Sequence, residues 1–407
     1  MTSAPIYLDN HATTRPDPRV LEAMWPYFTT IYGNAASASH RFGWEASEAV
    51  EKAREQVAAL LGAEDPREII FTSGASEANN LALKGGLPSL RRKGNHVITS
   101  AVEHKSVLGA LRRLGQEGWE VTVVPVDEFG QVRVEAVEAA MTERTVLVSV
   151  MAANNEVGTI NPLGAIGALC RDRGVVLHSD ATQAVGKVPL SVVSDGVGLL
   201  ALTAHKFYGP KGIGALYARR GEPRARLTAQ IDGGGHERGL RGGTLAVPLI
   251  VGLGAACEIA RREGLAEAAR VACLRDRLHA GIASRVDTIR LNGHPTERLA
   301  GNLNLSFGYV DGEALMMSMR EIAVSSGSAC TSANPEPSHV LTAMGLDEDL
   351  ARASLRFGVG RFNTEGEIDA AVEVVATAVA RLRAHSAAYG GGVATSVHGE
   401  RFDEAVQ

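Results

Sequence analysis

The chain has 407 residues, a mass of 42.8 kDa and a formal net charge of −5, from 41 basic and 46 acidic residues. Neither sign of charge dominates, which argues against nucleic acid as the main partner. The longest uncharged apolar stretch, residues 245–257, is interrupted by one proline and two glycines, so we expect no membrane-spanning helix. The sequence predicts a soluble globular protein that is long enough for two domains.

The N-terminus and the cysteines point to a reducing compartment. The first eight residues lack a basic start followed by an apolar run, so no signal peptide is predicted. The four cysteines show no CxxC spacing, which argues against a disulfide scaffold and a zinc ribbon. We therefore expect a cytoplasmic protein without a metal site.

In chain order, short β-branched runs alternate with helical patterns over the first 260 residues. The expected strands are 68–72, 97–99, 121–126, 145–150, 175–178 and 199–203, and the helices between them include 44–61, 106–115 and 163–173. This alternation predicts an α/β domain, in which helices cover both faces of a mostly parallel sheet.

The pattern changes beyond residue 261. Two helical stretches are followed by strands at 288–292 and 302–307, a helix, a polar loop, a strand at 354–359 and a helix at 365–383. This order is typical of a smaller α+β domain. We expect a large domain over residues 14–260, a small domain formed by 1–13 and 261–388, and a flexible tail over 389–407.

Polar side chains follow five of the expected strands. Ligands of parallel α/β sheets bind beyond the carboxyl ends of the strands, so these residues are candidates for a site. The first set, Ser73 to Glu77, opens a helix and suits an anion such as phosphate, although simple helix capping explains it as well. The other sets are Glu103-His104, Asn154-Asn155-Glu156, Asp180-Ala181-Thr182-Gln183 and His205-Lys206. Five such sets at one sheet edge predict an active site.

A phosphate site, a strand-end carboxylate and a lysine together fit pyridoxal phosphate. Its ring withdraws electrons when the pyridine nitrogen stays protonated, which a buried aspartate enforces, and a lysine amine holds its aldehyde. Asp180 and Lys206 occupy neighbouring strand ends, with Thr203 and His205 as further phosphate donors. Since the chain has neither a GxGxxG motif nor a P-loop, a nucleotide is a poorer fit.

Only seven lysines are present, which narrows the search for a reactive amine. Lys206 is the best candidate because it follows a strand end beside Asp180, and Lys105 is a distant second. We expect no polar cluster around Lys84 or Lys187, solvated positions for Lys52 and Lys93, and a turn at Lys211.

One cysteine differs from the other three. Cys170, Cys257 and Cys273 belong to apolar helical patterns and are expected in or near the core. Cys330 lies among small polar residues and is expected to be exposed and mobile. The residues alone leave open whether Cys330 is a nucleophile or a bystander.

The strand expected at 354–359 alternates between apolar and polar positions. Leu355 and Phe357 share one face, so Arg356 points the other way. Arg356 could clamp a substrate carboxylate through a bidentate pair, or it could form a surface salt bridge.

With these residues in hand, the chain resembles the cysteine desulfurases of the iron–sulfur-cluster assembly type. These belong to the class V aminotransferase group of fold-type-I pyridoxal phosphate enzymes. The resemblance runs from residue 6 to residue 383. It rests on GNAASASHRFGW (33–44), FTSGASEANN (71–80), EHKSVL (103–108), NNEVGT (154–159), HSDATQAVGK (178–187), HKFYGPKGIGALY (205–217), GGGHERGLRGGT (233–244) and SSGSACTS (325–332). The resemblance implies a large, mostly parallel seven-stranded sheet domain and a smaller α+β C-terminal domain.

The resemblance also implies residue roles. Lys206 would hold the cofactor, His104 would stack on its ring and assist proton transfer, and Cys330 would accept the sulfur. Asp180 would pair with the pyridine nitrogen, Gln183 would bond the ring oxygen, and Asn155 would lie beside the ring and the substrate. The phosphate would be bound by Ala75, Ser76, Thr203 and His205, joined by Thr244 of the partner subunit. Asn34 and Arg356 would hold the substrate carboxylate.

The activity so implied is the removal of sulfur from L-cysteine, giving L-alanine and a persulfide on Cys330. A homodimer would supply this sulfur to an acceptor or scaffold protein, for iron–sulfur clusters or for thiolation of tRNA or cofactors. The tail after Arg383 lacks the C-terminal segment with which housekeeping members dock their scaffold. Two alternatives stay open: an aminotransferase or lyase acting on another amino acid, and a sulfur-relay hub that mainly binds partners.

Overall fold

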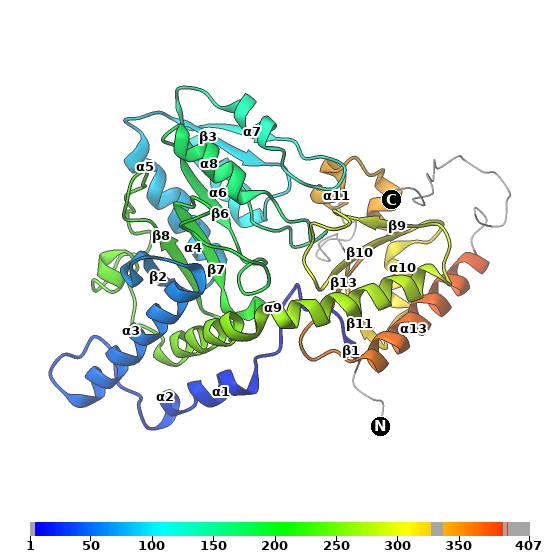
Figure 1. Ribbon diagram of the computed structural model, residues 1–407, viewed down its shortest axis with the longest axis horizontal. Helices are drawn as coiled ribbons and strands as arrows, with labels where there is room; N and C mark the ends of the chain where they lie inside the picture. The colour runs from blue at the N-terminus through cyan, green and yellow to red at the C-terminus, as the bar shows by residue number, and fades with distance from the viewer. Residues whose placement is uncertain (1–4, 327–336, 386–388, 390–407) are drawn as a thin grey trace.

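A sheet covered by helices on both faces forms the larger part of the computed structural model, which describes residues 5–326, 337–385 and 389 (Figure 1). Within the described residues this sheet has seven strands in the order β2-β8-β7-β6-β5-β3-β4. Only β8 runs antiparallel to its neighbours, so the predicted mostly parallel seven-stranded sheet is confirmed. The bounds are β2 (Ile69–Thr72), β3 (His96–Ser100), β4 (Glu120–Val124), β5 (Thr145–Ser149), β6 (Val176–Asp180), β7 (Leu199–Thr203) and β8 (Gly214–Ala218).

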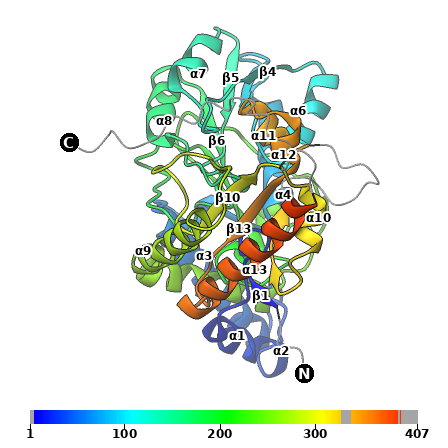
Figure 2. The ribbon, with the colours of Figure 1, turned by 90° about the vertical axis from the view of Figure 1, so that its right-hand side faces the viewer.

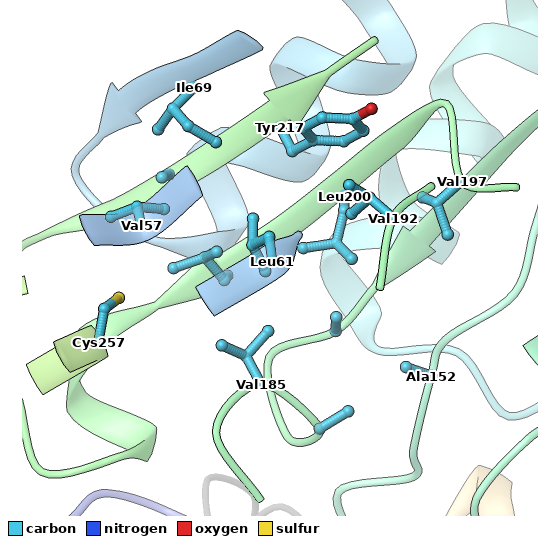
Figure 3. Close-up of a cluster of buried hydrophobic side chains, with 14 of the residues drawn as sticks. Val57, Leu61, Ile69, Ala152, Val185, Val192, Val197, Leu200, Tyr217 and Cys257 are labelled. Carbon is cyan, nitrogen blue, oxygen red and sulfur yellow. The ribbon is translucent and has the colours of Figure 1, made fainter. Parts of the chain in front are cut away.

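Apart from the edge strand β4, the strands are buried on both faces, as the apolar runs in the sequence require of a parallel sheet. One face packs against α3 (Arg41–Leu61), α7 (Val134–Ala140), α8 (Leu163–Asp172) and the first half of α9 (Val247–Ala283). The other packs against α4 (Ala75–Asn80), α5 (Gly86–Leu90) and α6 (Lys105–Gln116). Figure 3 shows the first of these cores, where Val57 and Leu61 of α3 lie with Ile69, Leu200 and Tyr217 of the strands.

The long helix α9 joins this part to a smaller one (Figures 1 and 2). It packs first on α3 and α1 (Pro18–Met24) and then on α13 (Glu365–Ala384). The prediction of two separate helical stretches after residue 261 is wrong, since α9 is continuous from Val247 to Ala283. Good helix formers flank Gly264, and one glycine costs only about 1 kcal/mol. The expected domain division at residue 260 falls inside this helix and stays a proposal.

The smaller part is built on a four-stranded antiparallel sheet in the order β12-β13-β10-β9. Its strands are β9 (Ile289–Asn292), β10 (Asn302–Phe307), β12 (Ser325–Ser326) and β13 (Ser354–Gly358). The second half of α9 and α13 share a core with it. The helices α2 (Pro26–Thr29), α10 (Gly312–Met317), α11 (His339–Ala343) and α12 (Glu348–Arg352) complete the described α-helices.

The N-terminal segment connects the two parts. Strand β1 (Ile6–Tyr7) pairs with β11 (Ile322–Ala323) in the smaller part, and Asp9 bridges to Gly358. Farther along, the backbone N–H of Thr14 donates to the carbonyl of His205 at 2.8 Å. Residues 9–14 therefore cross to the carboxyl edge of the large sheet, where the candidate site lies.

No helix in the described ranges is long and apolar enough to cross a membrane. The tail predicted to be flexible, residues 389–407, lies outside the described residues except for Tyr389.

Candidate active site

A cavity of about 510 Å³ opens at the carboxyl ends of the large sheet's strands. The predicted strand ends meet there, and Arg356 reaches in from β13 of the smaller part. Their side chains share one space. The predicted site residues that line it are Ala75, Ser76, His104, Asn155, Asp180, Gln183, Thr203, His205, Lys206 and Arg356.

Three predicted residues are not placed at this cavity. Asn34 is exposed, and its Oδ1 accepts a hydrogen bond from the backbone N–H of Ala36 at 2.9 Å. Thr244 is exposed at the end of its glycine-rich loop. Cys330 lies outside the described residues. Within one chain, neither Asn34 nor Thr244 is among the residues that line the cavity.

Lys206 is held by the N-terminal segment. It follows β7, and its Nζ donates to the carbonyl oxygens of His11 at 2.6 Å and Ala12 at 2.7 Å. Burial, followed by the nearby Arg356 guanidinium, lowers the pKa of Lys206 to about 8, although Asp9 and Asp180 oppose this shift. The amine is therefore neutral far more often at physiological pH than that of a free lysine, as a nucleophilic amine requires.

Asp180 is fixed at both carboxylate oxygens. It ends β6, and it is almost fully buried. Its Oδ1 accepts from the backbone N–H of Thr182 at 3.0 Å, and its Oδ2 accepts from Nδ2 of Asn79 at 2.8 Å. Asn79 lies on α4, one turn beyond Ala75, and the strand-end argument missed it. This placement suits a carboxylate that must hold a protonated ring nitrogen.

The same network reaches His104. Nδ2 of Asn79 also donates to Oγ of Ser106 at 2.9 Å, and that hydroxyl lies 2.8 Å from Nδ1 of His104. The backbone N–H of Ser106 donates to the same Nδ1 at 3.1 Å. Because a backbone N–H can only donate, Nδ1 is the unprotonated nitrogen and Nε2 carries the proton of the neutral ring.

Arg356 does not form the surface salt bridge that was its alternative. Its guanidinium donates to Oδ1 of Asp9 at 2.8 Å and to the carbonyl of Asn155 at 2.9 Å, with only 11% of the side chain exposed. Leu355 and Phe357 on either side lie in the core of the smaller part, as their alternation predicted. A part-buried cation thus faces the cavity.

The turn after β2 forms the opposite end of the cavity. The first N–H groups of α4 have no acceptor within the helix. Gly214 lets β8 approach this turn, since an added Cβ there would lie 2.4 Å from the carbonyl oxygen of Leu202 and 2.8 Å from Cα of Gly74. The Thr203 hydroxyl donates to the carbonyl of Ile213 at 3.0 Å. Burial, and then the Lys206 charge, lowers the pKa of His205 to about 4.

The described cysteines correct one prediction. Cys170 and Cys257 are buried as expected, and burial raises the pKa of Cys170 to about 12. Cys273 is exposed, contrary to expectation. Val271 and Leu274 turn into the core, and Cys273 between them falls on the outer face of α9.

Both flanks of the Cys330 segment lie beside the cavity. Ser325 of β12 is paired with Arg356. At the far side, Nε2 of His339 contacts the carbonyl oxygen of Glu103, next to His104, at 3.1 Å. The ten residues between, 327–336, lie outside the described part.

These donors fit pyridoxal phosphate. A lysine amine and a fixed carboxylate share one cavity with the first residues of α4. Three lining residues, His11, Thr182 and Arg356, each keep a buried side-chain polar atom without a hydrogen-bond partner within the described residues. The described ranges contain no group of three or more His, Cys, Asp or Glu side chains that could hold a metal ion. Fold and site together define a pyridoxal-phosphate-dependent enzyme of fold type I.

Known proteins narrow this class. The Aminotransferase class-V family matches residues 6–371, and the chain belongs to that family. It is 55% identical to the cysteine desulfurase IscS of Anaeromyxobacter dehalogenans (strain 2CP-C) over 95% of each chain. A solved NifS-like protein is 38% identical with a TM-score of 0.86, covering 93% of this chain and all of its own. SspA in complex with cysteine is 36% identical with a TM-score of 0.77, covering 88% of this chain and 100% of its own.

Proposed function

We propose that this protein is a cysteine desulfurase, which removes the sulfur of L-cysteine as a persulfide on Cys330 and releases L-alanine. The observation that carries the proposal is the cavity in which the Lys206 amine, the Asp180 carboxylate and the Arg356 guanidinium meet. The name of the 55% identical relative supports the reaction, and the cysteine bound to SspA supports the substrate.

The cofactor would be held at three places. Lys206 would bind its aldehyde, Asp180 its pyridine nitrogen and Gln183 its ring oxygen, with His104 stacked on the ring. Ala75, Ser76, Thr203 and His205 would bind the phosphate, together with Thr244 of the partner subunit. When bound, pyridoxal phosphate supplies an electron sink for negative charge at the substrate Cα.

Side chains of the protein would bind the substrate, remove its Cα proton and accept its sulfur. Arg356 and Asn34 would bind the substrate carboxylate, and Asn155 would lie beside the substrate and the ring. The Lys206 amine would take the Cα proton. The thiolate of Cys330 then attacks the substrate sulfur. The S–S bond forms as the C–S bond breaks, and the electron pair of that bond ends on Cβ, which takes up a proton. Return of a proton from Lys206 to Cα completes alanine.

Product analysis tests this function directly. Incubation with L-cysteine alone should yield L-alanine in equal amount to sulfur, with sulfide released when a reductant is added. A strict need for a 2-oxo acid would favour an aminotransferase. No turnover by the isolated, cofactor-loaded protein would favour the sulfur-relay hub.

The low pKa of Lys206 predicts the pH dependence of cofactor capture by cofactor-free protein. Only the neutral amine can attack the aldehyde, so the rate should rise about tenfold per pH unit below 8 and level off above it. Stopped-flow absorbance after mixing with pyridoxal phosphate measures the rate. A rise that continues through pH 9.5 would instead indicate an ordinary lysine.

Replacing Arg356 with alanine should raise KM for L-cysteine far more than it weakens cofactor binding. The loss of a charge-assisted carboxylate contact costs on the order of 1.5–3 kcal/mol, or roughly ten- to a hundredfold in affinity. Steady-state kinetics and cofactor titration of the same preparation separate the two effects. An unchanged KM would assign Arg356 to a purely structural pair with Asp9.

We also propose a homodimer, since five large aromatic side chains between residues 25 and 44, the segment that contains the predicted Asn34, are exposed. Trp25 is 67% exposed and Trp44 is 58% exposed, which is unusual for large apolar side chains that face only water. The five exposed aromatic side chains are Trp25, Phe28, Tyr32, Phe42 and Trp44.

Sedimentation should show a dimer, and Trp25→Glu with Trp44→Glu should produce monomers. These monomers should also bind pyridoxal phosphate more weakly, because each would lack Thr244 of the partner subunit. Glutamate at Val123, an exposed apolar residue of β4, is the matched control. A wild type that is fully active as a monomer would contradict the shared site.

We also propose which process uses the sulfur and in which compartment. The sulfur would serve iron–sulfur cluster assembly or thiolation of tRNA or cofactors in the cytoplasm, through an acceptor or scaffold protein. The Anaeromyxobacter relative, by its name a cysteine desulfurase, supports only the release of sulfur that such an acceptor would take.

A further inference from the structure

Lys187 contacts the cavity wall from outside the predicted site. Residues 181–188 form consecutive turns, in which Val185 N–H donates to the carbonyl of Ala181 at 3.0 Å. This spacing brings the side chains four residues apart onto one face. As a result, Nζ of Lys187 donates to Oε1 of Gln183 at 3.3 Å. The expectation that Lys187 has no polar surroundings is therefore wrong.

Three contacts determine how the Gln183 amide is oriented. Oε1 of Gln183 faces Lys187 and also lies 3.0 Å from Nδ1 of His11, and Nε2 of Gln183 donates to the carbonyl of His11 at 2.9 Å. The His11 carbonyl can only accept a hydrogen bond, and the Lys187 amine donates its own to Oε1. A flipped amide would place its NH₂ against Lys187 and its oxygen against the carbonyl, so one orientation is fixed.

This orientation has two consequences. Since Oε1 is an acceptor, Nδ1 of His11 must carry the proton, which leaves its buried Nε2 as the unprotonated nitrogen. The amide Nε2 has two hydrogens and uses one on the His11 carbonyl. Gln183 is 2% exposed and lines the cavity, so the wall presents an N–H donor there.

Stability does not explain the position of Lys187. In the described part of the chain no carboxylate lies within 4.0 Å of its amine, and the nearby Glu267 is already paired with Arg361 at 2.6 Å. Burial and the Lys206 charge lower the pKa of Lys187 to about 7. A cation placed in this way costs folding free energy, which a role in the site would explain.

We propose that Lys187 is a positioning residue that fixes the Gln183 amide, so that the cavity wall offers a hydrogen-bond donor to an acceptor oxygen of the bound ligand. It also holds His11 in the Nδ1–H form. The inference rests on the proposed function only for the identity of that ligand, pyridoxal phosphate, whose ring oxygen would be the acceptor.

The first test measures pyridoxal phosphate binding to cofactor-free protein by equilibrium dialysis. Lys187→Met should weaken binding about five- to tenfold, as expected for one misplaced hydrogen bond. Lys84→Met, which removes another half-buried lysine away from the cavity, should have no effect. In a Gln183→Met background, Lys187→Met should add nothing, because the lysine acts through that amide. Equal binding by wild type and Lys187→Met, or additive effects, would overturn the proposal.

The second test needs no cofactor. Nitrogen-15 NMR of labelled histidine should show His11 protonated at Nδ1 in the wild type and as a mixture of tautomers in Lys187→Met. Lys187→Arg keeps a hydrogen-bond donor and should therefore retain the wild-type His11 tautomer. If the methionine variant does not fold, the His11 tautomer in the arginine variant is the test of the proposal. If the wild type fails to bind pyridoxal phosphate, the proposed function falls; an unchanged His11 tautomer in Lys187→Met would overturn the role of Lys187 alone.

Discussion

Lys206→Ala should lower the turnover of L-cysteine by at least about 10³-fold and remove the visible absorbance of covalently held cofactor. The amine of Lys206 alone combines a place in the cavity beside Asp180 with hydrogen bonds to two carbonyl oxygens that aim it. Loss of both a covalent anchor and a general base costs factors of this size. Absorbance spectra of purified protein and alanine formation measure the two losses.

Lys105→Ala is the matched control for this prediction. Lys105 was the second candidate from the sequence, but it is exposed at the start of α6 and does not line the cavity. We expect its variant to keep the cofactor absorbance. A Lys206→Ala protein that turns over normally, or a Lys105→Ala protein that loses the chromophore, would reverse the assignment.

The convergence of the strand ends was predictable because it depends on local sequence. Each parallel strand is encoded by a short apolar run, and the residue at its carboxyl end is then known to within one or two positions. Asp180 ends β6 and Lys206 follows β7 at the sites that this reasoning indicated. The strand β8 was missed because its GALYA sequence has no β-branched residue.

The contacts that hold the lysine could not be predicted in this way. His11 and Ala12 are 195 and 194 residues from Lys206, and they reach it only because β1 belongs to the smaller part. Nothing in the local pattern around residue 11 indicates such a partner. The contact between Lys187 and Gln183 could not be predicted either, although Gln183 itself was identified as a site residue.

Cys330→Ser should leave cofactor absorbance and L-cysteine binding intact and stop the release of alanine. Serine is a poor nucleophile toward sulfur, so the reaction should halt before C–S cleavage. Cys330 lies outside the described residues, but Ser326 and Ser325 before it belong to β12, and Ser325 is paired with Arg356 at the cavity. Cys330 comes four residues after Ser326, and four residues of chain can span at most about 14 Å.

The matched control is Cys273→Ser, because Cys273 is exposed on α9 and offers a surface thiol away from the cavity. That variant should keep the wild-type rate. After a pulse of L-cysteine, mass spectrometry of the wild type should find one added sulfur on the peptide that contains Cys330. Burial keeps Cys170 and Cys257 protonated and out of reach, so they should carry none. Added sulfur on Cys273, or alanine release by Cys330→Ser at the wild-type rate, would show that another group accepts the sulfur.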